Sequence, residues 1–184
     1  IRLIDDAKRK DPNLDNGKPK ELLYSERMSE RLAQFAPDAS EILQIAARGQ
    51  HIERWTSARS DYPEGRAGYK KWRAELGLYH ATRVSEIMAT AGYSEEECAR
   101  AKYIVQKRGL GRDAETQCLE DVICLVFIEH YMADFATKSG YTEEKLIDII
   151  QKTWNKMSEK GHQAALSLPL ADELKALIGK ALAG

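Results

Sequence analysis

Residues 119–130 read LEDVICLVFIEH, and this stretch decides the fold class. Its consecutive apolar residues, Val122–Ile128, fall far short of the roughly 20 that a membrane-crossing helix requires. A helix that is apolar on every side is buried by its neighbours, so we expect a central helix over about Ala114–Thr137 that other helices surround. Glu120 and Asp121 open this buried run. Both carboxylates need partners there, because an unpaired buried charge is costly.

Apolar residues recur at helical spacing on both sides of this stretch. The expected helices cover about Leu22–Phe35, Ile42–Ile52, Tyr69–Ile87, Ser94–Val105, Thr142–Met157 and Leu174–Leu182, with stops at Pro37, Gly92, Gly109 and Gly161. Ser94 and Glu97 have the spacing of a capping box at the start of one helix. No segment alternates convincingly with the period of two that strands show, and the polar residues after Asn16-Gly17 are typical of a loop.

The sequence therefore predicts one all-α domain over residues 1–184, with about seven or eight helices. Residues 1–20 are expected to form an N-terminal helix and a loop that pack on the core. A chain of this length can bury roughly 70% of its unfolded surface, so it needs no disulfide or zinc ion in order to fold.

Charge and cysteine content narrow the partners and the compartment. The chain has 28 basic and 29 acidic residues, which argues against attraction of its whole surface to nucleic acid or to an anionic membrane. Its 3 cysteines include no CxxC pair, which is typical of a reducing compartment. The first residues, IRLIDD, do not resemble a secretory signal. We expect a cytoplasmic protein; the sequence leaves its oligomeric state open.

Two histidines and an aspartate have the chemistry of a metal site. His80 lies on the apolar stripe of its expected helix, His51 lies near the end of another, and Asp121 opens the central helix. Two imidazoles and one carboxylate that converge from three helices would suit a divalent transition metal such as Fe, Mn or Zn. The alternative is two core or boundary histidines and a carboxylate that is paired with an arginine.

The order of these residues resembles the HD-domain superfamily. The segments AARGQHI (residues 46–52) and LEDVICL (residues 119–125) are similar to the helices that carry its first His-Asp pair and its final Asp. That resemblance implies an all-α metal-dependent phosphohydrolase, or a relative of the family's di-iron oxygenases, with metal held by His51, His80 and Asp121. Ile52 stands where the family has the Asp of the pair, and Tyr24 or Glu26 stands where it has its first His.

A second resemblance covers nearly the whole chain. The strings QHIERW, LEDV, EHYMADF and KTWNKMS are similar to an uncharacterised domain-of-unknown-function family of bacteria and fungi, some fungal members of which are labelled glutamyl-tRNA synthetase-like. This family offers no activity to carry over. The synthetase motifs are incomplete here: His51-Ile52-Glu53-Arg54 lacks the glycine and the second histidine, and no parallel strands of a nucleotide-binding fold are visible. We therefore expect no synthetase activity.

Arginines close to the two histidines indicate an anionic ligand. Arg48, Arg54 and Arg83 flank His51 and His80, and guanidinium groups bind phosphate or carboxylate through paired hydrogen bonds. The alternative is that these arginines pair with glutamates such as Glu53 and Glu86 at the surface.

The leading hypothesis is a metal-dependent hydrolase that acts on a small phosphorylated or otherwise anionic metabolite. The metal would lower the pKa of a bound water, and Glu120 or Glu53 would take the proton. Arg48, Arg54 and Arg83 would hold the ligand. The alternative is an HD-like module without catalytic activity that binds a ligand or a protein. Nucleic acid and membrane partners are not expected.

Overall fold

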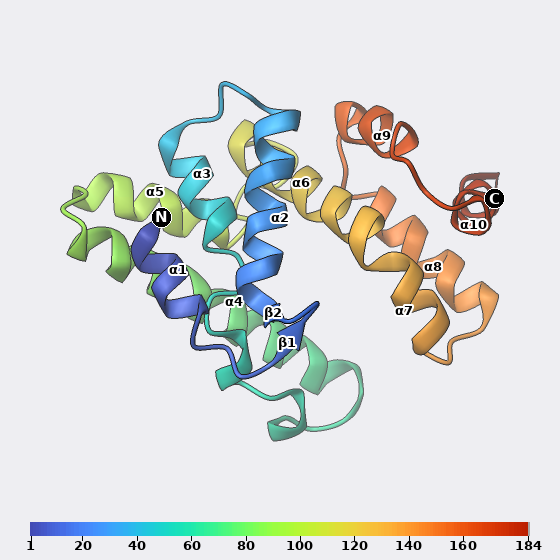
Figure 1. Ribbon diagram of the computed structural model, residues 1–184, viewed down its shortest axis with the longest axis horizontal. Coiled ribbons are helices and arrows are strands. Elements are labelled where there is room, and N and C mark those ends of the chain that lie inside the picture. The colour runs from blue at the N-terminus through green and yellow to red at the C-terminus, as the bar shows by residue number, and fades with distance from the viewer. Residues whose placement is uncertain (184) are drawn as a thin grey trace. The chain divides into compact units, whose positions relative to one another are not determined.

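Helices dominate the computed structural model, which describes residues 1–183 (Figure 1). The all-α prediction is confirmed. The described residues form ten α-helices, two short 3-10 helices and one small ribbon of two strands, which is more helices than the sequence predicts. Contacts divide the chain into two compact units, Ile1–Gly109 and Leu110–Gly184.

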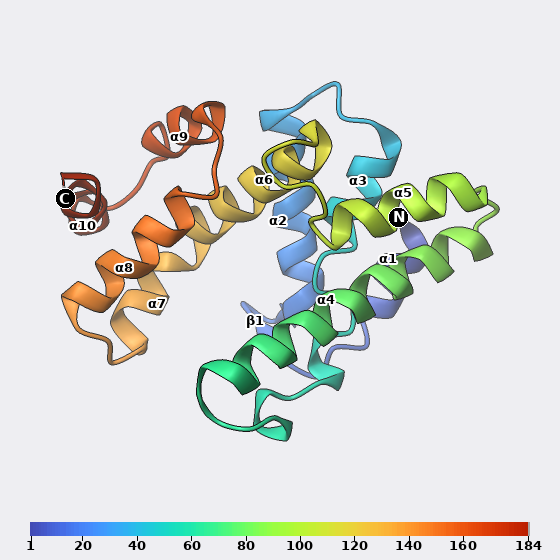
Figure 2. The ribbon, with the colours of Figure 1, turned by 180° about the vertical axis from the view of Figure 1, so that it is seen from behind.

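Unit 1 contains the N-terminal helices and the ribbon. Its elements are α1 (Arg2–Lys8), β1 (Leu14–Asp15), β2 (Lys18–Pro19), α2 (Lys20–Phe35), α3 (Glu41–Arg48), η1 (Arg54–Thr56), η2 (Arg59–Asp61), α4 (Gly65–Thr90) and α5 (Glu95–Val105). The long helix α4 lies along α5, while α3 packs against α2 and α5 (Figure 2). Met28, Ala46, Val84 and Ile104, one from each of α2 to α5, are completely buried where these helices meet.

Local signals set several helix ends. The predicted capping box is confirmed, because the Ser94 side chain accepts from the backbone N–H of Glu97 and the Glu97 side chain accepts from that of Ser94. Asn16-Gly17, predicted as a loop, instead turns between β1 and β2. Both residues have positive φ, 50° and 76°, which is the backbone that a tight two-residue hairpin requires.

Helix α3 ends earlier than the apolar spacing predicts. It stops at Arg48 rather than continuing to Ile52. A Cβ at Gly49 would lie 2.4 Å from Cγ2 of Val84, so glycine permits the close approach of α3 to α4 at this point. Residues 49–53 then form an irregular turn, in which His51 and Glu53 adopt left-handed φ values of 59° and 53°. The side chain of His51 is therefore placed by this turn and not by a helix.

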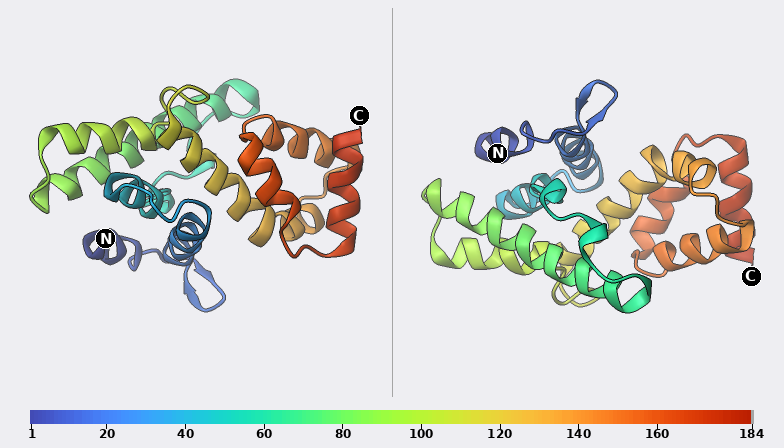
Figure 3. Two further views of the ribbon diagram at one scale, coloured as in Figure 1. Left: turned by 90° about the horizontal axis from the view of Figure 1, so that it is seen from above. Right: turned by 90° about the horizontal axis from the view of Figure 1, so that it is seen from below.

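Unit 2 contains α6 (Ala114–His130), α7 (Met132–Lys138), α8 (Glu143–Trp154), α9 (Glu159–Leu166) and α10 (Asp172–Ala183). The predicted helix over 114–137 is interrupted at Tyr131, which separates α6 from α7. The predicted stop at Gly161 is also wrong: α8 ends at Trp154, and Gly161 lies inside α9. Within the unit, α6 packs against α7 and α9, and α8 packs against α10 (Figure 3).

Helix α6 contains the apolar run of residues 122–128. Leu119, Val122, Leu125 and Val126 are completely buried. Over residues 1–183, no helix has both the length and the sustained hydrophobicity that a bilayer crossing demands.

Candidate functional site

Unit 1 contains a cleft of about 400 Å³ that is lined by the 49–53 turn, by α4 and by the residues that follow α5. We call it the His51–His80 cleft, because both histidines line it. Its other polar and charged lining residues are Gln50, Arg54, Arg73, Gln106, Lys107 and Arg108. Among the described residues, no aspartate or glutamate lines this cleft.

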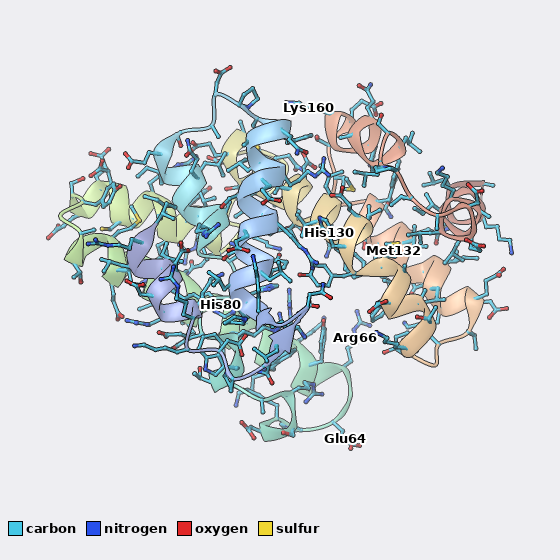
Figure 4. All side chains as sticks on the ribbon, in the orientation of Figure 1. Glu64, Arg66, His80, His130, Met132 and Lys160 are labelled. Carbon is cyan, nitrogen blue, oxygen red and sulfur yellow. The ribbon has the colours of Figure 1, made fainter. Side chains whose placement is uncertain are left out.

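His80 belongs to α4 (Figure 4), and a backbone carbonyl orients its side chain. Its Nδ1 lies 2.7 Å from the carbonyl oxygen of Ile52. Because a carbonyl can only accept, Nδ1 carries the hydrogen and Nε2 is left as an acceptor. This Nε2 is buried and has no hydrogen-bond partner in the structure. Burial, followed by the neighbouring His51, lowers the pKa of His80 to about 3, so the imidazole is neutral at physiological pH.

His51 lies beside it, with the two ring centroids 5.9 Å apart. Tyr24 stacks on the His51 ring, with the two ring centroids 4.5 Å apart. Nε2 of His51 lies 3.4 Å from a guanidinium nitrogen of Arg54, and Nδ1 lies 3.6 Å from Oε2 of Glu21. Burial, followed by the charge of Arg54, holds the pKa of His51 well below its usual value. Both imidazoles are therefore neutral.

Four cationic side chains line the cleft together with the two histidines. Arg54 is partly buried and lies over the ring of Trp72 at 5.2 Å, which restricts its guanidinium. Arg73 on α4 and Arg108 after α5 are exposed, and Lys107 is partly buried. Four cationic side chains thus line the cleft and no carboxylate does, although the chain as a whole has a net charge of -1. The carboxylate of Glu21 lies behind His51, with Oε2 3.6 Å from its Nδ1.

The backbone around this cleft is strained. Left-handed φ values are uncommon outside glycine, and in the described chain four non-glycine residues adopt them: Asn16, His51, Glu53 and Lys107. His51 and Lys107 line the cleft, and Glu53 belongs to the turn that carries His51. Such conformations cost free energy and concentrate at functional sites. The strain therefore coincides with the cleft.

The third predicted metal ligand, Asp121, is engaged in hydrogen bonds within its own unit. Asp121 lies on α6 in unit 2, where Oδ1 accepts from the backbone N–H of Ser158 at 2.8 Å and Oδ2 accepts from its hydroxyl at 2.6 Å. Gln117 also donates to Oδ1, at 3.1 Å. Asp121 thus anchors the start of α9. Across residues 1–183, no group of three or more His, Cys, Asp or Glu side chains is arranged to hold a metal ion.

The two predicted proton acceptors lie outside the cleft lining. Glu120 is buried, with Oε1 3.9 Å from Nζ of Lys156. Glu53 accepts from Arg83 at 2.9 and 3.1 Å and from the hydroxyl of Tyr79 at 2.6 Å. Its hydrogen bond with Arg83 is the main reason that the pKa of Glu53 is lowered, which makes it a weak base.

Of the three predicted ligand-binding arginines, only Arg54 lines the cleft. Arg48 forms a two-pronged pair with Asp5, at 2.7 and 3.0 Å. Arg83 is paired with Glu53 and, at 2.7 Å, with Glu86, as the alternative interpretation of the sequence has it.

Sequence reasoning favoured a surface ion pair for Arg73 over a role in ligand binding, and it did not consider Gln106, Lys107 and Arg108 as lining residues. One signal was available for Arg73, which precedes His80 by seven residues on the same predicted helix and so shares its face. For Lys107 and Arg108 the only sequence signal was a basic pair just before Gly109, at an expected helix end.

Comparison with known proteins yields one family. A sequence-family model described as Domain of unknown function (DUF4202) matches residues 1–178. No curated protein and no solved structure matches the chain. The description of the family names no activity, so function has to be argued from the cleft.

Proposed function

The chain belongs to the DUF4202 family, and we propose that its unit 1 binds a small phosphorylated metabolite in the His51–His80 cleft. One observation carries the proposal: four cationic side chains and no carboxylate line the same cleft as two histidines. The pKa values of both histidines are lowered, so that their imidazoles are neutral. The cleft volume of about 400 Å³ is that of a small-molecule site.

The lining residues match the chemistry of a phosphate ester. Guanidinium groups donate paired hydrogen bonds to phosphate oxygens, and an ammonium adds a point charge. Arg54 is partly buried, so its attraction for an anion is screened by salt less than that of a fully exposed arginine. The unsatisfied Nε2 of His80 is suited to accept a hydrogen bond from a hydroxyl of the same ligand.

Isothermal titration calorimetry with inorganic phosphate, glycerol 3-phosphate and a hexose phosphate tests this proposal. Arg73→Gln should weaken the affinity for the best of these ligands about tenfold, the loss of one charge-assisted hydrogen bond. Arg66→Gln is the matched control, because Arg66 is exposed on the same helix and does not line the cleft (Figure 4). The proposal fails if none of these compounds binds at low salt, or if both variants bind like the wild type.

Metal-dependent phosphate hydrolysis is the second candidate function, and the orientation of the imidazoles favours it. Nδ1 of His80 faces the carbonyl oxygen of Ile52, and Nδ1 of His51 faces a carboxylate oxygen. Metal-binding histidines are usually held in this way, with the other ring nitrogen left to bind the ion. The resemblance to the HD superfamily agrees with this reading. Nε2 of His80, and Nε2 of His51 once Arg54 has moved away from it, would hold an Fe, Mn or Zn ion.

In that reaction the metal would lower the pKa of a bound water and polarise the phosphoryl group. Arg54 and Arg73 would orient the phosphate, and the neutral imidazoles would leave the charge of the ion uncompensated, which favours an anionic substrate. Asp121 has no part in this version, because its oxygens bind Ser158.

Metal removal separates the two candidates. Protein stripped with EDTA and reloaded with Mn²⁺, Zn²⁺ or Fe²⁺ is assayed for phosphate release and for bound metal. For a hydrolase, release requires added metal and disappears in the His51→Gln, His80→Gln double variant. If the wild type holds no metal and ligand affinity is the same with EDTA present, the chain is a binding module and the hydrolase candidate is rejected.

A further inference from the structure

A buried glutamate lies close to Nδ1 of His51. Glu21 is on α2, its side chain is 9% exposed, and its Oε2 has no hydrogen-bond partner in the structure. The nearest imidazole atom is Nδ1 of His51, at 3.6 Å. We propose that Glu21 is a positioning residue that holds His51 in the Nδ1–H tautomer, so that Nε2 is offered to the bound ligand. This inference rests on the proposed function of the cleft.

The tautomer follows independently from the other side of the ring. Arg54 carries only donors, and its guanidinium nitrogen lies 3.4 Å from Nε2 of His51. Nε2 must therefore accept. In a neutral imidazole the single hydrogen is then on Nδ1, directed towards Oε2 of Glu21.

The distance of 3.6 Å is slightly longer than a hydrogen bond. Contacts of this kind are often long in an empty site and shorten when the ligand binds. A phosphate that attracts Arg54 would release Nε2 of His51 from the guanidinium. The contact with Glu21 would then be the remaining constraint on the tautomer.

Helix α2 fixes His51 from two directions. Glu21 and Tyr24 are three residues apart and so lie on one face of the helix. Tyr24 stacks on the ring of His51 with an interplanar angle of 14°, while Glu21 meets its edge. Because His51 has a left-handed backbone in an irregular turn, these two contacts replace the orientation that a helix would supply.

A buried lysine binds the backbone of Glu21. Nζ of Lys8, on α1, donates to the backbone carbonyls of Glu21 and Gln50 and is completely buried. Burial raises the pKa of Glu21, and the positive charges of Lys8 and Arg54 oppose that rise. The same ammonium ties the start of α2 to the turn that carries His51.

Nitrogen-15 NMR of the histidine side chains in the full chain tests the inference, because the two ring nitrogens have distinct shifts in each tautomer. Wild-type His51 should show hydrogen on Nδ1 and an acceptor Nε2. With saturating inorganic phosphate present to draw Arg54 away from His51, Glu21→Leu should give a mixture of tautomers, and Glu21→Gln, whose amide oxygen can accept, should restore the single form. In the Nδ1–H tautomer, Nε2 can accept a hydrogen bond from the hydroxyl of monohydrogen phosphate. If the two tautomers of His51 become equally populated, the affinity of the protein for inorganic phosphate should therefore fall about twofold.

Two controls are built into the molecule. His80 is held by a backbone carbonyl, so its spectrum should be the same in every variant. Glu30→Leu alters an exposed glutamate on the same helix and should change neither spectrum nor affinity.

The inference and the proposed function fail separately. Wild-type His51 with its hydrogen on Nε2 overturns the role of Glu21 without any variant. So does a His51 spectrum that is unchanged in Glu21→Leu when phosphate is bound. Absence of any phosphate binding by the wild-type chain, with His51 in the expected tautomer, instead overturns the proposed function of the cleft.

Discussion

The carbonyl oxygen of Ile52 accepts a hydrogen bond from Nδ1 of His80 at 2.7 Å. The side chain of Ile52 is completely buried in the core, so this residue acts on the cleft through its backbone. Its carbonyl oxygen orients the imidazole of His80, which lines the cleft.

Asp121 should contribute to stability and not to ligand binding. Replacement by alanine removes the acceptor for both donors of Ser158 and should lower the free energy of unfolding by about 3 kcal/mol, measured by urea denaturation. Ser158→Ala, which removes the hydroxyl alone, should cost about 1 kcal/mol, as is usual for a helix cap. Phosphate affinity and metal content should be unchanged in both variants. Loss of bound metal in Asp121→Ala, with stability intact, would restore Asp121 as a metal ligand.

Gly68 should be intolerant of any side chain. A Cβ at this position would lie 1.8 Å from the carbonyl oxygen of Pro63, so the loop before α4 would have to move. We expect Gly68→Ala to lower the free energy of unfolding by about 1–3 kcal/mol. Gly77→Ala on the same helix is the matched control: its Cβ would meet nothing within 4 Å, and alanine should stabilise the helix by about 1 kcal/mol. Equal effects of the two substitutions in thermal denaturation would contradict this account.

Helices were predictable because their determinants are local. Apolar spacing located the segments, and the side chains of Ser94 and Glu97 identified one helix start. The end of α3 at Arg48 was not predicted in this way, although Gly49 follows it at a point where Val84 of α4 leaves no room for a Cβ. The spacing of apolar residues continues to Ile52, although the chain has already left the helix.

The same distinction applies to the candidate site. His51, His80 and Arg54 were singled out by residue type and position, and all three line one cleft. The role of Asp121 depends on Ser158, which is 37 residues further along the chain. No pattern around Asp121 could distinguish such a cap from a metal ligand. Nothing in the sequence singled out Glu21, because the residue that it contacts, His51, is placed by an irregular turn that the apolar spacing does not predict.

The pair of Glu53 and Arg83 should weaken at low pH. The pKa of Glu53 is lowered from 4.5, chiefly by its hydrogen bond with Arg83, so the stabilisation is complete above that pH and is lost as the pH falls through the lower, folded value. Glu53→Gln should cost about 1 kcal/mol at pH 6, since the pair is partly exposed. The difference from wild type should shrink towards pH 3.

The other partner of Arg83 provides the control. Glu86 is 56% exposed, so Glu86→Gln should change the free energy of unfolding by less than about 0.5 kcal/mol at either pH. Urea denaturation at pH 6 and pH 3 measures both variants. A cost of Glu53→Gln that is the same at both pH values would exclude the proposed ionic contribution.

Lys8 should make stability rise with pH above neutrality. Burial is the main cause that lowers the pKa of Lys8 from 10.5 to about 7, although the charge of Glu21 opposes it. Between these values the unfolded chain binds a proton that the folded chain does not, so the free energy of unfolding increases as the pH rises. Below about pH 7 the full cost of burying the ammonium is present. From pH 7 to pH 9 the gain should be about 2 kcal/mol.

Lys8→Met isolates this contribution. The methionine leaves the carbonyls of Glu21 and Gln50 without their donor at every pH, so its absolute stability is less informative than the slope. The free energy of unfolding of the wild type minus that of Lys8→Met should rise between pH 7 and pH 9. For Lys10→Met, which alters an exposed lysine close by, the same difference should stay flat. Parallel pH profiles for wild type and Lys8→Met would mean that the buried amine keeps an ordinary pKa in the folded chain.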